Sequence, residues 1–348
     1  MTRAIAMLTI SFVLLVSHTS PVWSWGGDGH RTVGMIADIL LEQRPAIRDR
    51  VKQILGENSL SEVSVWADCA KGFRGCQRPP SDEEKAFARQ NRRHHLFHYT
   101  DVPIQQSLYR AGTAGTGSDD VVQVIQHAVR VLQGRTPNQG PAMLNQREAL
   151  WLLVHLVGDI HQPLHVGAIY YDGQCAEPVD PNIVGVGQPE FGIGTTVVST
   201  RGGNDLKINK SKSLHSYWDS DTVKGAMRLV DVRNKAVEDF ARAIVGSPPT
   251  GWKMSGDPGN WSAQWATEVM PLAKSALTRV QIGEGASAGG AFGKCAWPIA
   301  LDRSYTQWAN QQALIQVGKA GFRLAALLQA IFEMQADEPA YTGSVPKR

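Results

Sequence analysis

The sequence lacks the short motifs that mark several common enzyme classes. It contains no GxSxG nucleophile elbow, no GxGxxG dinucleotide-binding turn and no Gly-rich loop of the kind that cradles phosphates. It has four cysteines but no CxxC pair, which makes a zinc site built from thiolates a weak explanation for them. These absences argue against a serine hydrolase of the elbow type, a dinucleotide-dependent enzyme and a P-loop nucleotidase.

The sequence also lacks a strong excess of charge of either sign. The whole chain has a formal net charge of +3, and subtracting the single charge of Arg3 leaves +2 for residues 25–348. A balance this close to neutral neither supports nor excludes a polyanionic substrate.

Long apolar runs are scarce outside the N-terminus. The run 4–16 follows Arg3 and precedes Val22-Trp23-Ser24, a pattern that predicts a signal peptide over 1–24 with cleavage after Ser24. The alternative is an uncleaved anchor, for which the run is short. No second run is long enough to cross a bilayer, so we expect residues 25–348 to be soluble, secreted or periplasmic, without stable membrane association.

An even number of cysteines in an exported chain predicts two disulfides. A bond between Cys69 and Cys76 would close a short loop and leave Cys175 to pair with Cys295. This is one of three possible connectivities.

Apolar residues at spacings of three and four predict helices over most of the chain. The predicted helices are 29–55, 121–132, 146–160, 226–245, 262–280 and 308–334. Strand signal is sparse, with 195–200 as the best case and His98-Tyr99 as a second short extended piece. The Gly- and Pro-rich connections do not separate segments of different composition. We therefore expect one mainly α-helical domain over 25–348, with long loops and little strand.

The segment 155–165, HLVGDIHQPLH, carries the strongest chemical signal. His155 and Asp159 are four residues apart on a helical pattern, so both project from one face. Pro163 ends or kinks the helix, which takes His165 out of the regular helical count. His215 and Asp219 repeat the four-residue spacing. Imidazole with carboxylate suits zinc, and burying two such pairs without a cation would be costly.

Other histidines and acids give weaker signals. His30, Asp68 and His98 stand alone, and an isolated residue of this kind is more often an ordinary surface or hydrogen-bonded group. His161 lies six residues after His155 and faces another side of the helix, so we expect a structural or ligand-supporting role for it. A further group, His94, His95 and His127, has no partner spacing.

Several motifs taken together resemble one family, the secreted zinc-dependent single-strand nucleases. This is the family of mung bean nuclease and penicillium nuclease, also called class I nucleases or 3'-nucleotidases. The motifs occur in order through most of residues 25–348 as WGGDGH, VWAD, FHYTD, HLVGDIHQPLH, GGND and LHSYWD. The first of them directly follows the predicted cleavage site.

The resemblance implies a mainly helical fold of the zinc-dependent phospholipase C and single-strand nuclease type, holding three zinc ions in a cleft. The implied ligands are Asp68, His98, His155 and Asp159 for one zinc; the backbone amine and carbonyl of Trp25 with His30 and the bridging Asp159 for a second; and His165, His215 and Asp219 for a third. Nine donor residues exceed what one tetrahedral zinc uses, which agrees with a cluster.

The implied activity is endonucleolytic hydrolysis of single-stranded DNA and RNA to 5'-phosphorylated products, with 3'-nucleotidase activity. Asp68 is the implied catalytic residue that orients the attacking water. Four further positions resemble nucleotide contacts: Lys71 for phosphate, Tyr99 for base stacking, and Asp101 and Asn204 for base edges. Their ordinary alternatives are a surface lysine, a packed tyrosine, an Asx turn and a turn asparagine.

Two rival functions remain at this point. A zinc-dependent phospholipase C shares the helical fold and the trinuclear cluster, and only the peripheral residues and the HQPLH stretch favour nucleotides over lipid. A non-catalytic zinc-binding protein would need a closed cluster, for which the sequence offers no reason. Single-stranded nucleic acid and nucleotides are the expected partners, and nothing in the sequence indicates an obligatory protein partner.

Overall fold

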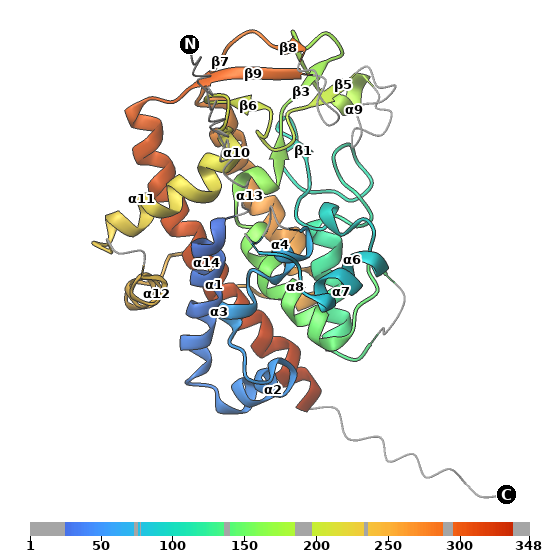
Figure 1. The fold of residues 1–348 in the computed structure, drawn as a ribbon, viewed down its shortest axis with the longest axis vertical. Coiled ribbons are helices and arrows are strands. Elements are labelled where there is room, and N and C mark those ends of the chain that lie inside the picture. Colours follow the sequence, from blue (N-terminus) through green and yellow to red (C-terminus); the bar gives the residue numbers. More distant parts are fainter. Residues whose placement is uncertain are drawn as a thin grey trace, which may run out of the picture.

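The computed structural model describes residues 25–72, 76, 78–135, 140–184, 197–232, 236–287 and 295–336. The described part is mainly helical, as predicted, with most of the short strands gathered at one end of the molecule, from which α14 runs toward the other end (Figure 1). The helices are α1 (Gly26–Leu41), α2 (Pro45–Leu55), α3 (Leu60–Val63), α4 (Trp66–Ala70), α6 (Asp82–Gln90), η1 (His94–Leu96), α7 (Val121–Leu132), α8 (Gln146–Asp159), η2 (Pro163–His165), α9 (Pro181–Val184), α10 (Leu214–Ser216), η4 (Tyr217–Asp221), α11 (Thr222–Leu229), α12 (Val237–Gly246), η5 (Pro258–Asn260), α13 (Trp261–Thr278) and α14 (Arg303–Ala336).

Four predicted helices match α7, α8, α13 and α14, whereas the other two predictions were too long. The range 29–55 is divided because Pro45 stands at the first position of α2, where it has no N–H to continue a preceding helix. The range 226–245 is divided after α11, where Asp231 takes a left-handed backbone conformation with φ 60°.

The core forms around α8 and α14. Every residue of α8 from Glu148 to Asp159 is buried, so this helix is enclosed by neighbours on all sides. α1 packs along α14 and also against α12. The apolar residues Leu324, Leu327, Leu328 and Ile331 of α14 form a stripe that is fully buried.

α14 is also the one helix of the described residues that is long and apolar enough to span a membrane. The qualifying stretch, Arg303–Glu333, has a mean hydropathy of 1.2, contrary to our expectation that no second run would pass this test. Its most apolar window is 67% buried inside the protein, which is typical of the core helix of a folded domain.

The strands form small sheets. Their bounds are β1 (Val102–Pro103), β2 (Gly167–Ala168), β3 (Tyr170–Asp172), β4 (Pro178–Val179), β5 (Val197–Ser199), β6 (Leu206–Lys207), β7 (Gln281–Ile282), β8 (Ala286–Ser287) and β9 (Cys295–Ala300). β5 lies in the predicted strand 195–200, of which 195–196 fall outside the described residues, and it pairs antiparallel with β3. The extended piece expected at His98-Tyr99 was wrong, because the chain turns there and β1 begins at Val102.

Two disulfides link the cysteines as Cys69–Cys76 and Cys175–Cys295, the pairing that the sequence favoured. The first adjoins Asp68, and the second ties the start of β9 to the turn that follows β3. The first therefore braces the segment that carries Asp68.

Candidate metal centre

Eight of the predicted site residues converge in the interior as three groups of side chains that could each hold a metal ion. Every member is buried, although the residues come from segments spread from α1 to η4. The groups are His30 with His155 and Asp159; Asp68 with His98 and His155; and His165 with His215 and Asp219. His155 belongs to the first two groups, so these adjoin each other.

Asp159, the last residue of α8, connects the first two groups. Its Oδ2 lies 2.9 Å from His98 Nδ1 and 3.1 Å from His155 Nε2, whereas its Oδ1 lies 3.3 Å from His30 Nε2. The two oxygens of one carboxylate thus face different imidazoles, which is the arrangement a bridging ligand needs. Gly158 permits it, because a Cβ there would lie 2.7 Å from His30 Nδ1.

Backbone carbonyls fix the tautomers of three imidazoles. The Nδ1 atoms of His155, His165 and His215 lie 2.7, 2.7 and 2.8 Å from the carbonyl oxygens of Ser64, His98 and Gly202. A carbonyl only accepts, so each Nδ1 must donate, and each Nε2 keeps its lone pair. Metal-binding histidines are commonly oriented in this way.

The third group contains buried polar atoms that lack a hydrogen-bond partner. Gln162 donates to Asp219 Oδ1 at 2.7 Å and so orients this carboxylate. Asp219 Oδ2 and His165 Nε2 are buried and have no hydrogen-bond partner among the described residues. Such orphaned atoms are costly in a protein interior. Asp219 lies on η4, a π-helical turn of a kind often found at functional sites.

Burial and neighbouring charges set the protonation of the groups. Burial lowers the pKa of His98 to about 3, with a further contribution from Lys71, and it lowers the pKa of His215 to about 3 together with His165. Both imidazoles are therefore neutral, the form that binds metal. Burial opposes ionisation of Asp68, but Lys71, whose Nζ lies 2.6 Å from Oδ1, helps to lower the pKa of this carboxyl to about 2.

Gly202 holds His215 in place through its carbonyl. Its backbone takes the left-handed conformation with φ 54°, and a Cβ at this position would lie 2.0 Å from the carbonyl oxygen of Leu164. A residue other than glycine would clash there, so this close approach explains the first glycine of the GGND motif, Gly202.

Trp25 lies next to the third group. It precedes α1 with a left-handed φ of 31°, and its indole is completely buried. A Cβ at the following residue, Gly26, would lie 3.1 Å from the carbonyl oxygen of Asp219. The start of α1 therefore touches the segment that carries Asp219, but the three groups consist of side chains alone, and the backbone role expected for Trp25 stays a prediction.

The four predicted substrate contacts line one hollow beside the histidines. Lys71, Tyr99, Asp101 and Asn204 surround it together with His98, His165 and His215. Sequence reasoning missed His95 and Arg201, which also line this hollow. The sequence could have pointed to them only through their neighbours, because His95 stands three residues before His98 and Arg201 directly precedes GGND.

His161 plays the structural role that was expected. Its Nδ1 lies 2.7 Å from the carbonyl oxygen of Val157, so it donates there, and its Nε2 accepts from Arg323 Nη1 at 2.9 Å. The buried Arg323 also donates to the carbonyl oxygen of Trp252 at 3.0 Å. This link ties the end of α8 to α14, away from the three metal-type groups.

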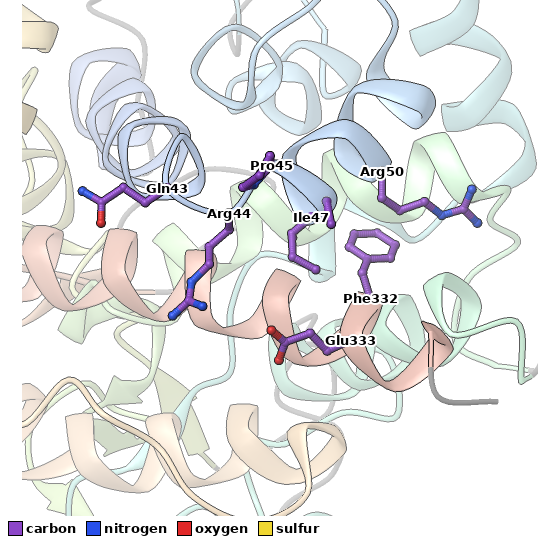
Figure 2. Close-up of a pocket in the computed structure, with 8 residues that line it drawn as sticks. Gln43, Arg44, Pro45, Ile47, Arg50, Phe332 and Glu333 are labelled. Carbon is purple, nitrogen blue, oxygen red and sulfur yellow. The ribbon is translucent and has the colours of Figure 1, made fainter.

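A separate hollow lies between the start of α2 and the end of α14 (Figure 2). Its lining includes Arg44, Ile47, Arg50, Phe332 and Glu333. It contains no histidine and a single carboxylate, so it lacks the donors of a zinc site. None of the predicted site residues lines it.

Comparison with known proteins gives consistent matches. A family model described as S1/P1 nuclease matches residues 25–333. Endonuclease 2 of Arabidopsis thaliana is 24% identical over 94% of this chain and 97% of its own length. Endonuclease 1 of the same plant is 26% identical over 98% of this chain and 96% of its own. Nuclease S1 of Aspergillus oryzae is 24% identical over 89% of this chain and 92% of its own.

Proposed function

This chain belongs to the S1/P1 nuclease family and is a nuclease that hydrolyses phosphodiester bonds, and we propose that it works with three zinc ions on single-stranded nucleic acid. The observation that carries the proposal is the set of three adjoining, buried His/Asp groups. The neutral imidazoles of His98 and His215, a carboxylate shared by two groups and orphaned buried atoms all fit metal ions, and the His/Asp donor set suits zinc.

The side-chain ligands that we propose are the members of these groups. The first zinc takes Asp68, His98, His155 and Asp159. The second would be held by His30 and the other oxygen of Asp159, and the family resemblance adds the backbone amine and carbonyl of Trp25. The third takes His165, His215 and Asp219.

Zinc ions bound here supply an activated water and stabilise negative charge that develops on the phosphate. The carboxylate of Asp68 accepts a hydrogen bond from the attacking water and orients it toward phosphorus. Lys71 is held 2.6 Å from Asp68, at the edge of the hollow, and contributes positive charge beside the scissile phosphate. Cleavage of the bond between phosphorus and O3' gives 5'-phosphorylated products, and the same reaction on a nucleoside 3'-phosphate accounts for 3'-nucleotidase activity.

The hollow beside the histidines is the proposed base site. Tyr99 stacks on the base, while Asp101 and Asn204 accept or donate hydrogen bonds at its edge. A base within a duplex must first be unpaired and unstacked, which costs a few kcal/mol. A free strand avoids most of this cost, so the enzyme prefers single strands.

The N-terminal ligand requires a defined start of the mature chain. We propose that a signal peptide of residues 1–24 is removed after Ser24, so that Trp25 acquires a free amine. The family match begins at Trp25, and disulfides are typical of proteins outside the reducing cytosol. These observations support a secreted or periplasmic location.

A matched pair of substrates tests the proposed function. The wild type should cleave a single-stranded oligonucleotide much faster than its duplex, and should show little hydrolysis of lecithin. Tyr99→Ala should weaken oligonucleotide turnover by removing about 1–3 kcal/mol of stacking without changing the zinc content, whereas Tyr99→Phe, which keeps the ring, should not. Equal rates on both strands would contradict the base-unstacking proposal, and faster lecithin hydrolysis would assign the chain to lipid chemistry.

A further inference from the structure

Arg201 occupies a position on the wall between two hollows. It lines the hollow beside the histidines and also a second hollow, and Tyr99 and Asp101 share this position. Its side chain keeps 41% of its surface exposed. Among the residues that line the hollow beside the histidines, Lys71 and Arg201 are the two permanently charged cations.

The guanidinium of Arg201 is fixed on one side by Asp205. Nε donates to Asp205 Oδ2 at 2.7 Å, and Nη2 donates to Oδ1 at 2.6 Å. The main chain of Asp205 is itself anchored, since its carbonyl oxygen accepts from the backbone N–H of Trp297 on β9 at 3.0 Å. No hydrogen bond among the described residues engages Nη1, so the guanidinium keeps donors for a second anion.

The loop that carries Arg201 has an unusual backbone conformation. Arg201 has φ 51°, a left-handed conformation that side chains other than glycine seldom take. Its carbonyl oxygen accepts from Asn204 Nδ2 at 3.0 Å, and the next carbonyl, that of Gly202, accepts from His215. One loop therefore positions both Arg201 and an imidazole of the third metal-type group.

The two cations have different surroundings. Lys71 Nζ lies 2.6 Å from Asp68 Oδ1, inside the metal-type cluster. Arg201 stands apart from the carboxylates of the cluster and pairs with Asp205, a residue outside it. A nucleic acid strand carries one phosphate per nucleotide, so a strand whose scissile phosphate is at the cluster must place neighbouring phosphates along the cleft.

We propose that Arg201 binds the phosphate adjacent to the scissile phosphate, and so favours substrates that carry a second phosphate beside the one that reacts. This inference rests on the proposed nuclease function. The planar guanidinium donates to a phosphate oxygen through Nη1 while Asp205 holds its other edge. Arg201 is a specificity residue in this role, because it contacts the substrate at a phosphate that does not react.

The experiment compares substrates with one and with two phosphates. The dinucleoside monophosphate TpT has only the scissile phosphate, and TpTpT has a neighbour as well. Arg201→Ala should raise KM for TpTpT by about tenfold or more, the factor expected when one charge-assisted hydrogen bond is lost, and should leave TpT almost unchanged. The salt dependence of log(kcat/KM) on a longer strand should become shallower by about 0.7, the slope for one phosphate contact on a single strand.

Arg93→Ala is the matched control. Arg93 also donates through Nε and Nη2 to both oxygens of one carboxylate, that of Asp119, at 2.7 and 3.2 Å, but it lines neither hollow. It should leave both substrates unaffected.

Strands with one uncharged linkage keep the inference testable even if Arg201→Ala folds poorly. Replacing either neighbouring phosphate of a longer strand by a methylphosphonate should, at one of the two positions, raise KM for the wild type by a similar factor. The same replacement should have little further effect on Arg201→Gln, which has lost the positive charge that the phosphate pairs with. Equal losses on TpT and TpTpT, or no effect of methylphosphonate at either position, would overturn the role of Arg201. Failure of the wild type to cleave any oligonucleotide would instead overturn the proposed function.

Discussion

Replacing Gly202 by alanine should damage the third metal-type group from outside it. The glycine has φ 54°, and the added Cβ would lie 2.0 Å from the carbonyl oxygen of Leu164, a backbone atom that cannot swing away. Its own carbonyl oxygen accepts the Nδ1–H of His215 at 2.8 Å. Relief of the clash must therefore move the loop. This movement would displace the carbonyl group of Gly202 that holds the His215 imidazole in place.

The expected cost has two parts. A left-handed backbone costs a residue with a Cβ about 1–2 kcal/mol, and forcing extra volume into a packed site costs about 1–3 kcal/mol. Together they predict a loss of about 2–5 kcal/mol in the free energy of unfolding. Gly134→Ala is the control, because Gly134 has φ 72° with no atom within 4 Å of the added Cβ, so only the first part applies.

The assay is urea unfolding of both variants, with zinc content measured on the same samples. Gly202→Ala should be less stable than Gly134→Ala by about 1–3 kcal/mol, and it should lose zinc because His215 loses its anchor. Equal stability of the two variants, with full zinc content in Gly202→Ala, would refute the claim that this close approach supports the site.

Two further predictions concern groups around the ligands. Gln162→Leu removes the side-chain amide that donates to Asp219 Oδ1 at 2.7 Å. Zinc affinity, measured by competition with a chelator, should weaken by about 10- to 100-fold. Unchanged affinity would show that Asp219 needs no such support. A single extra Met before Trp25 should abolish the proposed amine ligand while the helical core stays folded by circular dichroism, and full activity with the Met confirmed by mass spectrometry would disprove that ligand.

The sequence predicted the helical class and the convergence of the metal-type residues well. HLVGDIHQPLH and LHSYWD are dense local patterns, and the spacing of His155 from Asp159 alone places both on one helix face. Helix ends were predicted less well. Asp231 ends α11 through a left-handed backbone conformation, which no apolar periodicity reveals.

The supporting residues of the site could not be found from local pattern. Ser64 contributes a carbonyl oxygen, which every residue type has, so its role depends only on the tertiary position of α3 and α8. Arg201 reaches the hollow because its loop is folded over Leu164, and Gln162 acts because η4 brings Asp219 within 2.7 Å. Such roles arise from contacts between distant segments.

Zinc content of freshly purified, active protein tests the central claim most directly. Three adjoining groups of buried His and Asp side chains, two of them linked by Asp159, predict close to three zinc ions per chain by elemental analysis. Asp159→Ala should lose more than one of them, since both oxygens of this carboxylate are assigned as ligands. A value near one zinc per chain in fully active wild type would contradict the trinuclear centre.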